Sequence, residues 1–200
     1  MVEKAINYAK QFIGVKYTGW NPESGFPQKN CAPFWIDNKP PPPIELIKKN
    51  GLCCVGLTNL IRRYTGLQIP GLVDGELNFL NFIGGTENWF HYLKENNRLK
   101  KIDYKEKVPV GTLLLQNYNE IDQGHVAIII DQDERGLFYS TKIHAIQHDI
   151  DDKYNTVIDH KYNNVIDHKY NKVLVEKFND YFYYSRYTHI CYPEDWILKN

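Results

Sequence analysis

Patterns typical of helices come early in this chain, and patterns typical of strands come late. Apolar residues at helical spacing predict an amphipathic helix from Val2 to Ile13 and a second helix that begins near Cys54 and ends at Gly66. A short third helix is predicted from about Glu87. Helices followed by strands are typical of the α+β class. We therefore expect N-terminal helices packed on an antiparallel β-sheet.

The strand predictions all fall after residue 109. They cover 110–116, 125–131 and 137–147, and the sequence DERG at 133–136 is predicted to be the turn between the last two. The aromatic-rich stretch 181–192 alternates well enough for one further strand.

Length and composition predict a single domain over residues 1–200, because 200 residues with 42% hydrophobic content can bury one core. Proline and glycine interrupt regular structure in a Pro-rich loop at about 21–50. A loop of this length inside a small domain is typically functional or forms the wall of a groove.

An octapeptide repeat occupies most of an excursion at about 148–177. Its three units read YNTVIDHK, YNNVIDHK and YNKVLVEK, at residues 154–161, 162–169 and 170–177. Three short units cannot bury a core of their own, so we expect an extended β-hairpin or a surface excursion that grew by duplication. Duplication alone explains the recurring Asp-His pairs, and no metal site is predicted from them.

Charge and hydropathy exclude several classes of partner. Lysines and arginines (24) balance aspartates and glutamates (24), so no nucleic-acid partner is expected. No run of 18 apolar residues occurs, and the opening MVEKAINYAK carries charges where a secretory signal is apolar. We expect a soluble protein with no membrane span and no signal peptide, and the oligomeric state stays open.

The four cysteines fit neither a zinc spacing nor a dense disulfide framework. They stand at positions 31, 53, 54 and 191. Adjacent cysteines bond to each other only with strain, which favours free thiols in the cytoplasm or another reducing compartment. We predict no metal and no cofactor.

Cys54 is the candidate nucleophile. It stands at the start of a predicted helix, whose dipole and unpaired amides favour a thiolate. Projecting the helix puts Cys53 near the centre of the apolar stripe and Cys54 at its edge, where a cleft can reach it. The alternative is that both are ordinary buried cysteines. On the same helix, Arg62 and Arg63 are expected to form a solvated face.

Two histidines, His125 and His144, are expected on neighbouring strands. A two-residue turn at 134–135 pairs residues whose numbers sum to 269, as 125 and 144 do, although a bulge would make the pair diagonal. A zinc site would need a third ligand that no HxxxH or HExxH element supplies. We predict instead that His125 is the general base and that His144 orients it.

Five segments resemble one family, the NlpC-type cell-wall cysteine endopeptidases, which are papain-like. CCVGLT at 53–58 resembles the DCSGLV nucleophile motif, HVAII at 125–129 resembles the HVGIY base motif, and the IHA tripeptide recurs at 143–145. NYAKQFIGVKYTGW at 7–20 and VPVGTLLL at 108–115 are similar to the family's opening helix and its PGDLVFF strand. The nucleophile precedes the base, as in the non-permuted branch.

The resemblance implies a papain-like fold and a cysteine peptidase or amidase with a Cys-His-His triad. Cys54 would attack, His125 would act as base and His144 would orient it, while Tyr17 would line the cleft near the oxyanion. The implied substrate is a peptide or amide, such as the stem peptide of peptidoglycan.

Three positions depart from the family's polar pattern. Cys53 replaces an aspartate, Val55 a serine and Thr112 the aspartate of PGD. These departures motivate a rival hypothesis, in which a binding module keeps the cleft but has lost turnover. A second enzyme hypothesis is an acyltransferase or thioesterase-like activity on lipid or protein substrates with the same triad.

Overall fold

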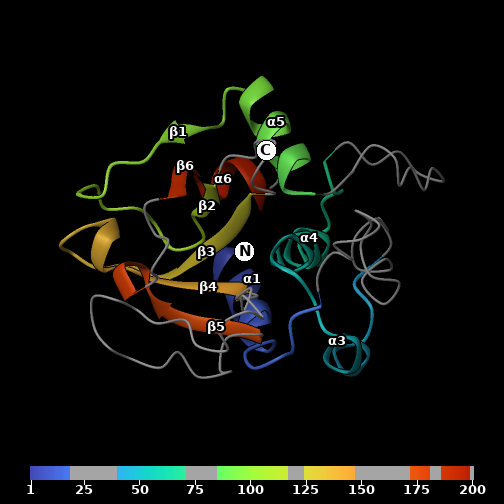
Figure 1. Ribbon diagram of the computed structural model, residues 1–200. Helices are drawn as coiled ribbons and strands as arrows, with labels where there is room; N and C mark the ends of the chain where they lie inside the picture. Colours follow the sequence, from blue (N-terminus) through green and yellow to red (C-terminus); the bar gives the residue numbers. More distant parts are fainter. Residues whose placement is uncertain (19–39, 71–84, 117–123, 147–171, 181–185, 199–200) are drawn as a thin grey trace, which may run out of the picture.

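A six-stranded antiparallel sheet lies at the centre of the computed structural model (Figure 1). The strand order is β1-β6-β2-β3-β4-β5, and each neighbouring pair is antiparallel. The strands are β1 (Lys100–Lys101), β2 (Leu113–Gln116), β3 (His125–Asp131), β4 (Thr141–Ile146), β5 (Lys172–Lys177) and β6 (Tyr187–Cys191). The structure describes residues 1–18, 40–70, 85–116, 124–146, 172–180 and 186–198. The predicted combination of helices with an antiparallel sheet is confirmed.

The helices that matter most for the site are α1 and α4. They pack against each other, and α4 also contacts β3 and β4. The helical elements are α1 (Val2–Lys10), α3 (Ile44–Asn50), α4 (Cys54–Tyr64), α5 (Thr86–Glu95), α6 (Pro193–Trp196) and the 3₁₀ turns η2 (Leu137–Tyr139) and η4 (Phe178–Asp180). Within the described ranges, no helix is long and apolar enough to cross a membrane.

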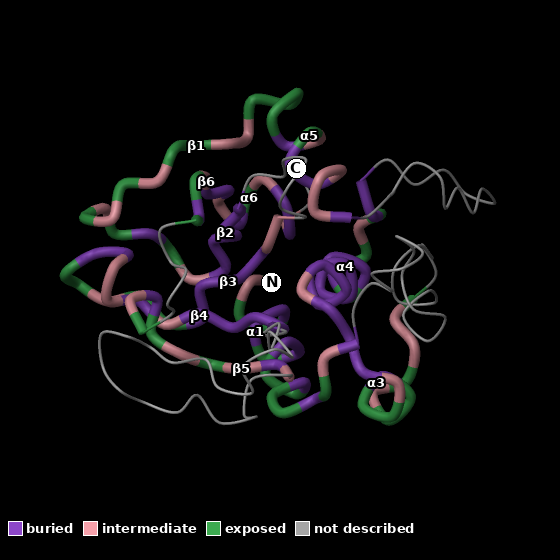
Figure 2. The backbone as a smooth tube through the Cα atoms, viewed as in Figure 1, coloured by how far each residue is buried: buried purple, intermediate pink, exposed green. Residues whose placement is uncertain are grey.

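Both faces of the central strands are buried (Figure 2). Successive residues of a strand point to opposite faces, so Leu113 and Leu115 pack with α1 and α4, while Leu114 packs with Leu137 and Phe178 on the second face. This explains why β2 and β3 read as nearly continuous apolar runs.

Helix α4 is enclosed on more sides than its apolar stripe predicts. Its helical spacing is confirmed, but the expected solvated face is wrong, because Arg62 and Arg63 are 8% and 5% exposed. Arg62 donates hydrogen bonds to the carbonyls of Gln68 and Trp196, and its guanidinium lies 5.4 Å from the Trp89 ring centre. Hydrogen-bonded in this way, a cation can be buried between helices.

Three local predictions need correction. The Pro-rich loop at about 21–50 ends in α3, because a proline at the start of a helix does not block the residues after it, and Pro43 is the N-cap. The predicted strand 137–147 begins with η2 and becomes extended only at Thr141. Position 110 is also too early for β2, which begins at Leu113.

The third octapeptide unit belongs to the sheet. Residues 172–177 form β5, which pairs with β4 from Thr141↔Lys177 to Ile146↔Lys172. The first two units, at 154–169, lie outside the described residues. Of the two expectations, the extended hairpin describes the third unit, which pairs antiparallel with β4 and adds an edge strand to the sheet.

Candidate active site

Cys54 is the first residue of α4 and the most exposed of the described cysteines. Cys53 and Cys191 are each 1% exposed, whereas Cys54 is half-buried. Burial raises the pKa of the Cys191 thiol, which keeps it protonated and inert. Cys31 lies outside the described residues. Cys54 is therefore the most solvent-accessible of the described thiols, and it lies at a helix end whose dipole favours a thiolate.

Cys53 holds the N-cap position of α4. Its backbone is extended, and its sulfur accepts a hydrogen bond of 3.3 Å from the Gly56 N–H. An N-cap side chain normally satisfies one of the amides that have no partner inside the helix. The thiol here takes the part that an aspartate would take in the motif the sequence resembles.

The segment that carries Tyr17 lies beside the start of α4. Leu52 donates its N–H to the Lys16 carbonyl, and its own carbonyl accepts from the Thr18 N–H. Gly51 permits this approach, because it has a φ of +85° and an added Cβ would lie 2.7 Å from the Lys16 carbonyl oxygen. Half-buried Tyr17 is thus held beside Leu52, in the segment leading into Cys54, and its role in lining a cleft stays a prediction.

His125 and His144 are joined by a hydrogen bond. His125 Nε2 lies 2.9 Å from His144 Nδ1, and the ring centres are 5.2 Å apart. The predicted adjacency of the two rings is confirmed. The register expected from a two-residue turn is wrong, and the diagonal alternative describes the pair. Ile128 pairs with Ile143, so the sum is 271 and the histidines are diagonal neighbours. The connection contains η2 and is longer than a two-residue turn, which moves the register.

Two charged residues lie behind His144, and the sequence analysis missed both. Glu176 Oε1 is 2.9 Å from His144 Nε2 and 2.5 Å from Lys142 Nζ. Lys142 Nζ also lies 3.2 Å from His144 Nε2. The side chains of Lys142 and His144 are fully buried, and that of Glu176 is 17% exposed. These residues come from adjacent strands, β4 and β5, and share one face of the sheet with His125.

The ion pair sets the charge of Glu176. Burial alone would raise its pKa, but the hydrogen bond from His144 and the charge of Lys142 outweigh burial and lower the pKa to about 2. Burial lowers the pKa of Lys142 to about 8, against the opposing effect of Glu176. At neutral pH, Glu176 is a carboxylate and Lys142 its buried counter-ion.

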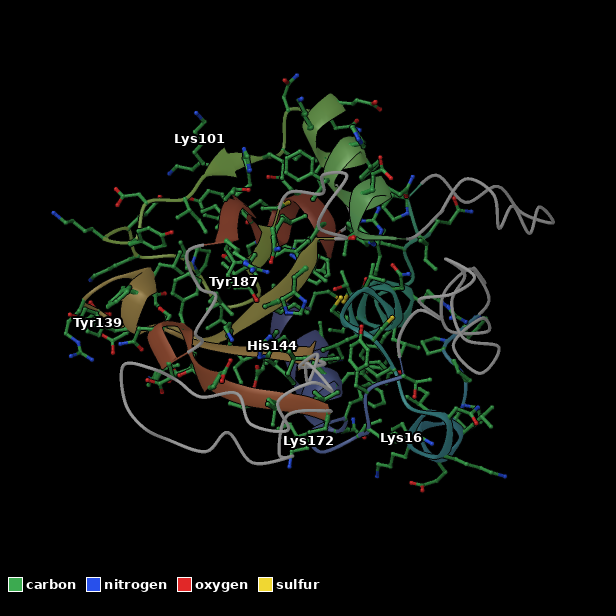
Figure 3. The ribbon with its side chains drawn as sticks, viewed as in Figure 1. Lys16, Lys101, Tyr139, His144, Lys172 and Tyr187 are labelled. Carbon is green, nitrogen blue, oxygen red and sulfur yellow. The ribbon has the colours of Figure 1, made fainter. Side chains whose placement is uncertain are left out.

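An aromatic ring flanks the other side of His125. The ring centre of Tyr187, on β6, lies 5.9 Å from that of His125, and Phe178 packs next to Tyr187. Figure 3 labels Tyr187 and His144 on the sheet, beside which α4 lies. Packing of this kind restricts how the imidazole of His125 can turn.

Two positions that depart from the family's polar pattern, and the described tryptophan Trp89, have structural roles. Thr112 is fully buried and donates to the Pro109 carbonyl in the turn before β2. Val55 is 1% exposed and belongs to the core. Trp89 is fully buried and donates to Asn59 Oδ1, while Trp20 and Trp35 lie outside the described ranges. Among the residues with described positions, no three His, Cys, Asp or Glu side chains form a group that could hold a metal ion.

Comparison of the chain with protein-family models finds no match, and comparisons with curated proteins and with solved structures find none either. The functional argument therefore depends on the motifs of the sequence and on the geometry described above.

Proposed function

We propose that this protein is a cysteine hydrolase with a papain-like, NlpC-type fold that cleaves peptide or amide bonds. The observation that carries the proposal is the 2.9 Å hydrogen bond between His125 and His144, on two strands that pack against the helix beginning at Cys54. An imidazole oriented by a second polar group and a thiol at a helix N-terminus are the two parts that nucleophilic catalysis by cysteine requires, and the proposal unites them in one reaction.

In the proposed reaction, His125 takes the proton of Cys54 and the thiolate attacks the carbonyl carbon of the substrate. The backbone N–H of Cys54 and the side chain of Tyr17 stabilise the oxyanion of the tetrahedral intermediate. When the C–N bond breaks, His125 returns the proton to the leaving amine. Water then attacks the thioester, His125 accepts its proton, and the acid leaves as the thiol is restored.

The proposed substrate class is a peptide with unusual linkages, such as the stem peptide of peptidoglycan. This part depends on the resemblance of the segments at 53–58, 125–129 and 143–145 to the NlpC-type motifs.

The first test is the reactivity of Cys54. Wild type, Cys54→Ala and His125→Ala are treated with iodoacetamide near pH 7, and the modified cysteine is identified by mass spectrometry. We expect His125→Ala to slow the alkylation of Cys54 at least tenfold, while the buried Cys191 stays slow in both proteins. Equal rates for Cys54 and Cys191, together with no effect of His125→Ala, would contradict the proposal.

The second test concerns the substrate. Wild type and Cys54→Ala are incubated with peptidoglycan fragments and with a panel of lipid and peptide amides, and the products are read by mass spectrometry. Cleavage by wild type alone supports a hydrolase and identifies the bond. Transfer of an acyl group to an added amine would indicate an acyltransferase, and a reactive Cys54 without products from any substrate would favour a binding module.

A further inference from the structure

We propose that Glu176 is a positioning residue that fixes the tautomers of His144 and His125, so that the lone pair of His125 is on Nδ1. This inference rests on the proposed function, in which His125 serves Cys54 as base. Glu176 stands outside the motifs at 53–58, 125–129 and 143–145, in the third octapeptide unit. Its role follows from the directions in which protons can be donated along one chain of contacts.

The first contact decides the tautomer of His144. A carboxylate offers only acceptor lone pairs, and Glu176 Oε1 lies 2.9 Å from His144 Nε2. If Nε2 had no proton, two lone pairs would face each other at this distance. The favoured arrangement has His144 donating through Nε2–H, which leaves the lone pair of the neutral ring on Nδ1.

The second contact, between the two imidazole rings, determines the tautomer of His125. His144 Nδ1 lies 2.9 Å from His125 Nε2, and since Nδ1 is the acceptor, Nε2 of His125 is the donor. The lone pair of a neutral His125 is therefore on Nδ1, the ring nitrogen that does not contact His144. When Nδ1 takes a proton, both hydrogen bonds remain, and the carboxylate at the end of the chain stabilises the imidazolium.

A hydrogen bond from Lys142 to His144 Nε2 would favour the opposite tautomers of both histidines, but the distances argue against this bond. An ammonium donating to His144 Nε2 would put the proton of that ring on Nδ1 and the lone pair of His125 on Nε2. Lys142 Nζ is closer to Glu176 Oε1, at 2.5 Å, than to His144 Nε2, at 3.2 Å. Its three protons can rotate away from Nε2, whereas the carboxylate has no proton to offer. Lys142 therefore acts as the counter-ion of Glu176.

The three octapeptide units differ at the position that Glu176 occupies. Glu176 stands at the seventh position of its unit, where the first two units have His160 and His168. The acidic residue thus occurs in the unit whose strand lies next to His144.

Variants that remove Lys142 allow a test without leaving a buried ammonium unpaired. We compare Lys142→Met, which keeps the carboxylate, with Lys142→Met/Glu176→Leu and Lys142→Met/Glu176→Gln. The readout is the pH dependence of iodoacetamide alkylation at Cys54. We expect the leucine variant to react about tenfold or more slowly at Cys54 than Lys142→Met near pH 7, with its profile moved to higher pH. The glutamine oxygen can still accept from Nε2–H, so the glutamine variant should be intermediate.

Two outcomes separate this inference from the proposed function. If wild-type Cys54 is reactive and depends on His125, but both double variants match Lys142→Met, the role of Glu176 is overturned and the hydrolase proposal stands. If wild-type Cys54 has no enhanced reactivity, the proposed function itself fails.

Nuclear magnetic resonance of the folded wild type gives a reading that needs no variant. Long-range ¹H–¹⁵N spectra of the histidine rings, recorded at a pH where both are neutral, distinguish Nε2–H from Nδ1–H tautomers. We expect Nε2–H for both His144 and His125. Nδ1–H at His144 would overturn the inference even if the double variants fail to fold.

Discussion

Cys54 and His125, the proposed nucleophile and base, are held in place by different physical means. Around Cys54 the determinants belong to the backbone and the core: a helix N-terminus, a thiol cap from Cys53, and the close approach at Gly51. Around His125 they are side-chain hydrogen bonds and charges that extend through His144 to Glu176. We infer that substitutions near Cys54 act mainly through packing, and those behind His125 mainly through charge and proton position.

The largest expected effect comes from breaking the buried ion pair on the base side. Glu176→Leu leaves the ammonium of Lys142 fully buried without its counter-ion, and we expect a loss of about 3–5 kcal/mol in the free energy of unfolding. Lys142→Met should lose much less, because Glu176 keeps its hydrogen bond from His144. Urea unfolding of both variants measures the difference. Equal losses would mean that the charge of Lys142 is not what makes the pair important.

Acid should destabilise the base side through the same carboxylate. The pKa of Glu176 is lowered to about 2 in the folded protein, against 4.5 when unperturbed. A lowered folded-state pKa stabilises the protein above pH 4.5, and this contribution is lost as the pH falls toward 2, by at most roughly 1.4 kcal/mol per pH unit. The Lys142→Met/Glu176→Leu variant should show a shallower loss of stability over this range in thermal unfolding. Parallel curves for the two proteins would contradict the assignment.

On the nucleophile side, Gly51→Ala should act through the backbone. The residue has a φ of +85°, and its Cβ would collide with the segment that carries Tyr17, so we expect a loss of about 1–3 kcal/mol and slower alkylation of Cys54. Gly14→Ala is the matched control, because Gly14 has a similar φ of +83° and no atom within 4 Å of the added Cβ. A loss at Gly51 no greater than at Gly14 would show that the close approach is unimportant.

The smallest expected effect comes from deleting the first two octapeptide units. Removing residues 154–169 shortens the connection between Ile146 and Lys172 from 25 residues to nine and keeps β5 intact. The loop-closure entropy changes by only roughly 1 kcal/mol, and we expect Cys54 alkylation to stay at the wild-type rate. A large loss in the free energy of unfolding or in the rate of Cys54 alkylation would assign those units a role in the core or the site.

The sequence predicted the elements better than the contacts between them. Helical spacing and apolar runs located α1, α4 and β3, because those signals are local. The buried Arg62 was not foreseeable, since its carbonyl partner at Trp196 lies 134 residues away. The register between β3 and β4 depended on the η2 turn, which the DERG motif did not indicate.

Some residues of the candidate site could be predicted from local sequence motifs, and others could not. Cys54, His125, His144 and Tyr17 could be proposed from the sequence because short motifs carry them. Glu176 was missed because its unit looked like a decayed repeat, although the change from histidine at the seventh position was visible. A buried lysine such as Lys142 cannot be recognised without its partner, which lies 34 residues away.

The buried ammonium of Lys142 also has a consequence for a chain that contains three similar octapeptides. Residues 172–177 of the third unit occupy the edge position next to β4, and an earlier unit paired in the same register would take their place. Either of the first two would bring His160 or His168 to the position of Glu176, and a neutral or positive ring cannot neutralise Lys142. At about 3 kcal/mol or more for an unpaired buried charge, the correct copy is preferred by a factor of roughly a hundred or more. The charge of Lys142 therefore favours the pairing of β4 with the repeat unit that contains Glu176.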